Sequence, residues 1–107
     1  MKLQSVLIAV AVLLLPLPAQ PAEIAPELWD RPRSAQAVMA QPAVQQAVAA
    51  YQARGTSRIV IIHNTRQEAQ LQAEELRAWL VALAVDSARL QLRTDPAAKA
   101  VGIEVTE

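Results

Sequence analysis

A strand, a helix and a second strand follow one another between residues 57 and 92, and this unit limits the possible folds more than any other stretch. Residues 59–62 (Ile-Val-Ile-Ile) are a continuous β-branched run that is too short for a helix and is typical of a strand buried on both faces. Residues 65–84 repeat apolar side chains on one helical face, and residues 88–93 alternate apolar with polar side chains. We therefore predict two parallel strands joined by a right-handed helical crossover.

The segments around this unit complete a small α/β fold. Ser34 is a favourable N-cap, and Pro42 divides the segment that follows into helices at about 35–40 and 42–53. Residues 101–105 alternate again and predict a last strand, antiparallel to the preceding one because the turn between them is too short for a crossover. The expected fold class is α/β, a two-layer sandwich of helix–strand–helix–strand–strand order with a small mixed sheet. Residues 34–107 are expected to form this single domain.

Residues 1–22 have the pattern of a secretory signal peptide. Lys2 gives a positive start, an almost entirely apolar segment follows, and prolines precede the small residues Ala19 and Ala22. Cleavage is expected after Ala22 or Ala19; an uncleaved anchor is the alternative, and it would be the chain's contact with a membrane. The expected location is the periplasm of a Gram-negative cell, with secretion as the alternative. Residues 23–33 form a Pro-containing arm before the domain.

The composition excludes several classes of site. The 107-residue chain contains no cysteine, which rules out disulfides, thiolate metal sites and a cysteine nucleophile. Its formal net charge is zero and it has no basic run, so nucleic-acid binding is not expected. No cofactor, metal site or enzyme activity is predicted, because the sequence has no spaced carboxylate pair and only two glycines. The single histidine, His63, is interpreted as a structural residue at the end of a strand.

The turn after the first strand is the candidate ligand site. It lies at the carboxyl end of the central strand and at the start of a helix, where open α/β sheets bind ligands and where backbone N–H groups favour anions. Asn64, Thr65 and Arg66 form the turn and Arg93 ends the neighbouring strand, so these four residues are predicted to hold a carboxylate or phosphate. The alternative is that Thr65 and Glu68, at capping-box spacing, satisfy the N–H groups themselves.

The first strand also predicts a contact surface. A sheet with helices on one face leaves the other face of this strand uncovered, and uncovered apolar area usually marks an interface. Trp29, Ile59 and Ile61 are the candidate interface residues. Two alternatives bury the strand within the chain: the 23–33 arm lies across it, or the helices divide between the two faces. For Trp29 the alternatives are a cap on one end of the core and a platform for a ligand.

Several short motifs follow one another along the domain. They are Arg-Ile-Val-Ile-Ile-His-Asn-Thr at 58–65, Trp79-Leu80, Ala84-Val85, Arg89-Leu90 and Gly-Ile-Glu-Val at 102–105. In this order they resemble the OmpA-like peptidoglycan-binding domain, over about residues 34–105. The resemblance implies an α/β fold, a place in the cell envelope and, as ligand, the diaminopimelate-containing stem peptide of peptidoglycan.

The chain departs from that family at the ligand site. Arg66 stands where the family has its motif aspartate, so the charge is reversed, and Gln72 aligns with the family's helix arginine. The loop between strand and helix is also shorter than in the family. Peptidoglycan binding, if kept, would therefore use a changed carboxylate site.

The expected function is that of an exported, non-enzymatic binding or scaffolding domain at the cell envelope, acting through protein contacts. The partner would be another envelope protein or a second copy of the chain, with the strand at 101–105 as an edge open to pairing. Two alternatives are a weak or modified peptidoglycan contact at the strand–helix turn, and an uncharacterised small periplasmic enzyme.

Overall fold

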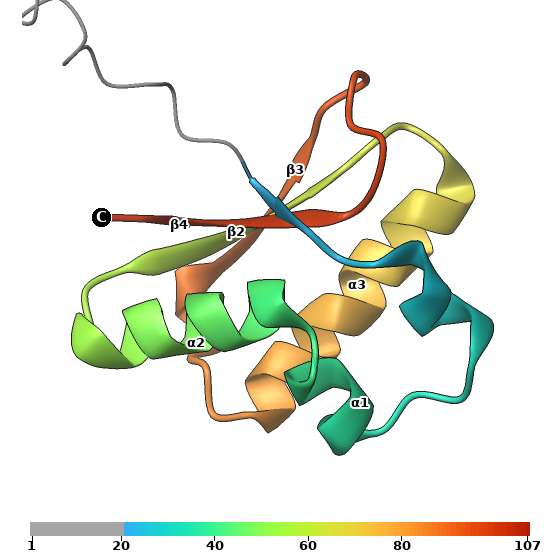
Figure 1. The fold of residues 1–107 in the computed structure, drawn as a ribbon. Helices are drawn as coiled ribbons and strands as arrows, with labels where there is room; N and C mark the ends of the chain where they lie inside the picture. Colours follow the sequence, from blue (N-terminus) through green and yellow to red (C-terminus); the bar gives the residue numbers. More distant parts are fainter. Residues whose placement is uncertain (1–20) are drawn as a thin grey trace, which may run out of the picture.

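Four strands form one mixed sheet in the order β1-β4-β2-β3, and all the helices cover one face of it (Figure 1). The computed structural model describes residues 21–107, so the predicted signal peptide lies outside the described residues except for Pro21 and Ala22. The chain is an α/β domain, as predicted. Its elements in chain order are β1 (Ala22–Glu23), η2 (Pro26–Asp30), α1 (Ala35–Met39), α2 (Pro42–Ala53), β2 (Arg58–His63), α3 (Gln67–Ala82), η3 (Ser87–Arg89), β3 (Leu90–Thr94) and β4 (Gly102–Thr106).

The two helices before β2 lie within one residue of the predicted bounds. The Ser34 hydroxyl accepts a hydrogen bond from the N–H of Ala37 and caps α1. Pro42 occupies the first turn of α2, where its missing N–H costs no helical hydrogen bond. None of the helices within residues 21–107 is long and apolar enough to span a membrane.

The strand pairing confirms one prediction and corrects another. Strands β2 and β3 are parallel, with Ile61 opposite Leu92, as the strand–helix–strand pattern predicted. The prediction that β4 pairs with β3 is wrong: β4 is antiparallel to β2, with Ile61 opposite Ile103. The connection between β3 and β4 passes the end of β2, where the N–H of Asp95 donates to the carbonyl of His63. This arrangement gives the most apolar strand a neighbour on each side.

The arm adds a fourth strand that the sequence did not predict. Ala22 pairs with Ile103, and the N–H of Ile24 donates to the carbonyl of Val101 at 2.8 Å. Strand β4, predicted to be an edge, therefore lies between β1 and β2. The arm approaches closely because Gly102 has no side chain; a Cβ there would lie 3.1 Å from Cβ of Pro21.

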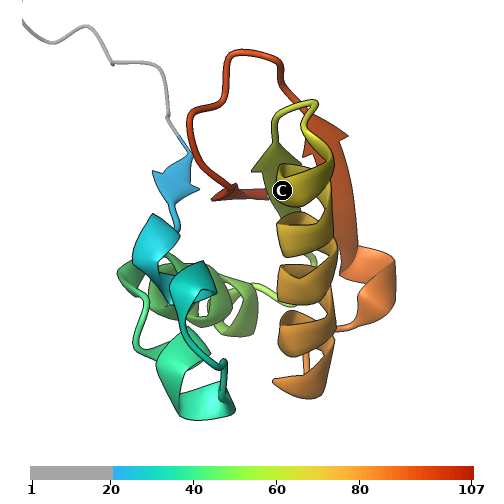
Figure 2. The ribbon, with the colours of Figure 1, turned by 90° about the vertical axis from the view of Figure 1, so that its right-hand side faces the viewer.

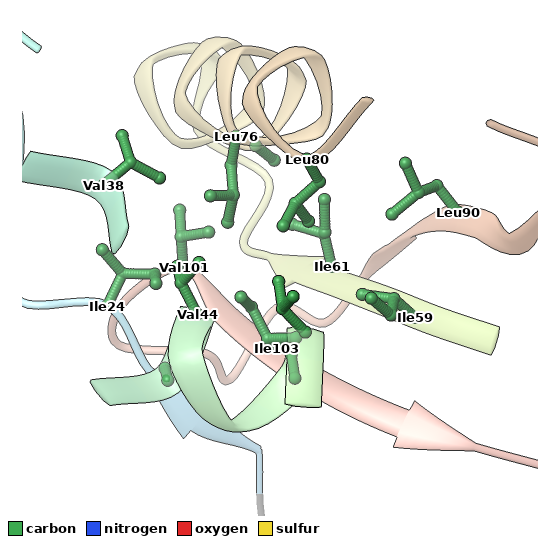
Figure 3. Packing of buried hydrophobic residues seen from close by; sticks show 14 of the residues in the cluster. Ile24, Val38, Val44, Ile59, Ile61, Leu76, Leu80, Leu90, Val101 and Ile103 are labelled. Carbon is green, nitrogen blue, oxygen red and sulfur yellow. The ribbon is translucent and has the colours of Figure 1, made fainter. Parts of the chain in front are cut away.

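The core lies between the sheet and the helices (Figure 3). Leu76 and Leu80 of α3 point toward Ile61 of β2, and all three side chains are fully buried. Ile59 is fully buried as well. The assignment of Ile59 and Ile61 to an interface is therefore corrected: both face the helices, because the odd-numbered residues of β2 point into the core.

The other face of β2 carries Val60 and Ile62, which are also buried. No helix of residues 21–107 lies over this face (Figure 2). Glu104 stands opposite Val60 on β4, and Arg93 stands opposite Ile62 on β3. Their ion pair, at 3.0 Å, therefore crosses β2 above the two apolar side chains. The methylene groups of such long side chains cover apolar surface while the charges stay in water.

Candidate functional site

A cavity of about 280 Å³ opens between the arm, the first turns of α3 and the end of the β3–β4 connection. It lies at the carboxyl end of β2, the place where open α/β sheets bind ligands. Its walls combine charged, amide, aromatic and apolar groups, so it can contact a ligand of mixed character. The residues that line it are Ile24, Pro26, Trp29, Asp30, Asn64, Arg66, Glu68, Ala69, Gln72, Lys99, Ala100 and Val101.

The turn at the base of the cavity is fixed by its own hydrogen bonds. The Asn64 side chain accepts from the N–H of Arg66 at 2.9 Å and donates to the carbonyl of Ala98 at 3.2 Å. His63 is 7% exposed, and its Nδ1 lies 2.7 Å from the carbonyl oxygen of Asn64. His63 therefore belongs to the support of the turn and does not line the cavity.

The start of α3 has no side-chain cap. Arg66 occupies the N-cap position and accepts no hydrogen bond there. The predicted capping box of Thr65 and Glu68 is not formed, and the Glu68 carboxylate instead accepts from Gln72 at 3.3 Å. The first N–H groups of a helix without caps are left to water or to a ligand. They favour an anion, and residues of this first turn line the cavity.

The cavity holds two positive and two negative side chains. Arg66 and Lys99 supply the positive charges, and Asp30 and Glu68 the negative ones. Within residues 21–107 none of the four takes part in an ion pair; the pairs found there join Arg33 to Glu75, Arg54 to Glu107 and Arg93 to Glu104. A ligand that carries both a carboxylate and an ammonium group would find a partner for each.

A second cluster holds the arm against α3. Both Arg33 and Glu75 contribute two atoms to a bidentate pair, each hydrogen bond being 2.8 Å long. The guanidinium of Arg33 also lies 5.7 Å from the ring centre of Trp29 and donates to the carbonyl of Trp29. The indole N–H of Trp79 donates to Glu75 at 3.1 Å. We call this cluster of four residues the arm latch; it sets the position of Trp29 in the cavity wall.

The arm latch changes the titration of both charged groups. The hydrogen bonds from Arg33 hold the pKa of the Glu75 carboxyl below its usual value, against the opposing effect of desolvation. The same contact with Glu75 raises the pKa of Arg33. The pair is therefore held in its charged form across the neutral pH range.

The structure brings some of the predicted site residues together and separates others. Asn64 and Arg66 line the cavity, and Trp29 lines it from the arm. Thr65 lies in an adjoining groove with Arg66 and Lys99. Arg93 lies apart from these, bound to Glu104 on the open face of the sheet. The prediction that Arg93 converges with the turn is therefore wrong.

Sequence reasoning missed two residues that supply charge to the cavity. Lys99 comes from the β3–β4 connection and Asp30 from the arm, and neither belongs to a recognisable motif. Gln72 was indicated through the resemblance, as the position of the family's helix arginine, and it does line the cavity.

The part of the chain that the structure describes contains no metal-binding cluster. Among residues 21–107 no three His, Cys, Asp or Glu side chains lie close enough to hold a metal ion. Comparison with protein-family models, curated proteins and solved structures finds no match to the chain. The geometry and the charges of the cavity are therefore the features of the molecule that indicate a function.

Proposed function

We propose that this protein is a non-enzymatic binding domain of the bacterial cell envelope, and that its cavity binds a carboxylate-bearing peptide of the cell wall. One observation carries the proposal: Arg66 and Lys99, without ion-pair partners in the described residues, meet an uncapped helix start in one cavity. A carboxylate there gains charge-assisted hydrogen bonds from side chains and from the backbone.

The rest of the cavity fits the chemistry of a peptidoglycan stem. Asp30 and Glu68 offer acceptors to an ammonium group, and the indole of Trp29 offers apolar area to a methylene chain. Diaminopimelate has two carboxylates, two amino groups and a methylene chain between them. The resemblance to the OmpA-like family supports the position of the site: Arg66 and Gln72 occupy the two positions at which that family contacts its ligand, with the charge reversed at the first and lost at the second, so the contacts proposed here differ from the family's.

Binding is proposed in preference to Ser–His or Cys–His hydrolysis because of which side chains line the cavity; its carboxylates, Asp30 and Glu68, are interpreted as acceptors for an ammonium group. No Ser, Thr, Cys or His is among its lining residues. A nucleophile and a base within hydrogen-bond reach of each other are the usual minimum for covalent hydrolysis. The compartment is part of the proposal: the pattern of residues 1–22 favours export to the periplasm.

Co-sedimentation with purified peptidoglycan sacculi tests the proposal. The full-length sequence is expressed, and the protein is purified with whatever processing the host cell performs. This protein should pellet with sacculi. Arg66→Ala and Lys99→Ala should each weaken binding roughly 10- to 150-fold, since a hydrogen bond to a charged group contributes roughly 1.5–3 kcal/mol. Arg54→Ala is the matched control, because Arg54 is an exposed arginine at the other end of the sheet.

Competition separates the two halves of the ligand. Diaminopimelate should displace the protein from sacculi, whereas glutarate, which has two carboxylates and no amine, should displace it less well. Asp30→Asn should make diaminopimelate and glutarate more nearly equal in how well they displace the protein from sacculi. The proposal fails if the wild type does not pellet, or if Arg54→Ala is as defective as Arg66→Ala.

Protein contacts are the second candidate function. The observation that favours them is the outer edge of β3, which pairs with no strand among residues 21–107. Exposed strand edges recruit additional strands.

A further inference from the structure

The outer edge of β3 presents backbone groups whose direction follows from the hydrogen bonds on its inner side. The N–H of Asp95 donates to the carbonyl of His63 on β2. Residues of a parallel strand direct their backbone groups alternately to one neighbour and the other. Gln91 and Arg93 therefore bond to β2, while Leu90, Leu92 and Thr94 direct their N–H and C=O groups outward.

This outward set is complementary to itself. When two copies of β3 pair antiparallel about Leu92, each Leu92 exchanges two hydrogen bonds with its counterpart. Thr94 then stands opposite Leu90 of the other copy and donates its N–H to the Leu90 carbonyl. The N–H of Leu90 is already bonded to the carbonyl of Ser87, so it makes no demand on the partner. Four hydrogen bonds form.

Charge selects this register over the nearest alternative. Pairing about Arg93 would also give four backbone bonds, but it places Arg93 directly opposite Arg93 of the other copy. Like charges in direct opposition destabilise a strand pair. Pairing about Leu92 places Arg93 opposite Gln91, and it places the half-buried Leu92 side chains against each other on the helix side of the sheet.

The two-fold axis that relates the two β3 strands also relates helix α3 to its copy. Helix α3 packs on the helix-covered face of the sheet, and in Figure 2 it lies between the arm and β3. Its flank turned away from the arm carries Glu74, Arg77 and the 41%-exposed Val81, at helical spacings of three and four. A two-fold axis between the paired β3 strands places the second α3 on the same face of the joined sheet, on the side of this flank.

The strand lacks three of the common protections against such pairing. Natural edge strands are blunted by lysine, proline or a bulge. Residues 90–94 contain no lysine or proline, their pairing with β2 is continuous, and the one charged side chain, Arg93, is bound to Glu104. We propose that β3 is a homodimer interface, which joins two four-stranded sheets into one of eight strands. The inference gives the second proposed function its partner, a second copy of this chain.

Cysteine cross-linking tests this register directly, because the natural chain contains no cysteine. Paired residues in an antiparallel ladder have Cα atoms about 5.5 Å apart, within the range of a disulfide. Leu92→Cys should therefore form a covalent dimer on mild oxidation of the purified chain. Gln91→Cys is the matched control: Gln91 stands opposite Arg93, which leaves the Cα atoms of the two substituted residues about 8 Å apart and beyond disulfide reach.

Proline substitution tests the same edge without a cross-link. Thr94→Pro removes an outward N–H and leaves the inner ladder intact, whereas Thr94→Ala keeps the N–H. By sedimentation equilibrium, the wild type and Thr94→Ala should dimerise with concentration, and Thr94→Pro should weaken dimerisation at least 10-fold with an unchanged Tm. The inference is overturned if the wild type stays monomeric at about 1 mM, if Thr94→Pro dimerises normally, or if Gln91→Cys cross-links as well as Leu92→Cys. None of these measurements involves sacculi, so they fail independently of the cavity proposal.

Discussion

The two flanks of α3 differ in their contacts with the rest of the chain. One flank carries Glu75 and Trp79, which complete the arm latch, and Gln72, which lines the cavity. The other carries the exposed Glu74 and Val81 and the half-buried Arg77, none of which contributes to the arm latch or the cavity. The buried apolar face of α3, which carries Leu76 and Leu80, lies between the two flanks. One amphipathic helix thus forms a wall of the cavity on one side and carries the flank proposed for dimerisation on the other.

The largest effect should come from the face that the two flanks share. Leu76 is fully buried in the centre of α3, and Leu76→Ala should reduce the free energy of unfolding by roughly 2–5 kcal/mol. Sacculus binding and dimerisation should then decline together. Leu71→Ala is the control on the same helix: Leu71 is 57% exposed, so the change should stay within about 0.5 kcal/mol in chemical denaturation. Equal effects of the two substitutions would contradict this packing.

A smaller effect of opposite sign is expected at the end of α3. Ala84 is the one non-glycine residue among 21–107 with positive φ, at 75°, and it closes the helix where the N–H of Val85 donates to the carbonyl of Leu80. A left-handed conformation costs an alanine about 1–2 kcal/mol, part of which glycine loses again to unfolded-state entropy. Ala84→Gly should therefore stabilise the domain by about 0.5–1 kcal/mol while leaving both flanks unchanged.

Ala82→Gly provides the matched control for that substitution. Ala82 is exposed in the last turn of α3 and lies within the helix, so glycine there should destabilise by about 0.5–1 kcal/mol. Thermal unfolding of the two variants should shift Tm in opposite directions. A lower Tm for Ala84→Gly would show that the helix does not end in this conformation.

The smallest expected effect is a pH dependence that is confined to the flank of α3 facing the arm. Contact with Arg33 lowers the pKa of Glu75 below its ordinary value of 4.5, so the carboxylate stabilises the folded arm above about pH 4.5. That contribution is lost as the pH falls from 4.5 through the lowered pKa. Glu75→Gln removes this titration and keeps an acceptor for Trp79.

Tryptophan fluorescence reports this change, because Trp29 and Trp79 are the protein's two tryptophans and both belong to the arm latch. The wild type should show an acid transition below pH 4.5 that is absent or reduced in Glu75→Gln. Dimerisation, which uses the other flank, should be the same in both proteins. Identical acid transitions in the two would place the titrating group elsewhere.

Local periodicity made most of the fold predictable. The β-branched run of β2, the apolar stripe of α3 and the proline at the start of α2 are all properties of neighbouring residues. The order of the strands is not. Whether β4 joins β3 or β2 depends on the path of residues 95–101, and the two-residue β1 carries no pattern that a sequence can reveal.

The candidate site was predictable only as far as it is local. Asn64 and Arg66 were found because they follow a strand and precede a helix. Arg93 was misplaced because its partner, Glu104, comes within reach only once β4 lies beside β2. Lys99 and Asp30 were missed because they reach the cavity from two segments that meet only in the folded chain.

The pairing of β1 with β4 also determines when the arm can fold. These strands lie near opposite ends of the domain, so the contact closes a loop of nearly its whole length. Contacts between such distant residues form late and slow the folding of a chain. As the domain is synthesised, the cavity wall that contains Trp29 cannot form until the residues of β4 have emerged. Removal of those last residues by a protease would release the arm and with it one side of the cavity.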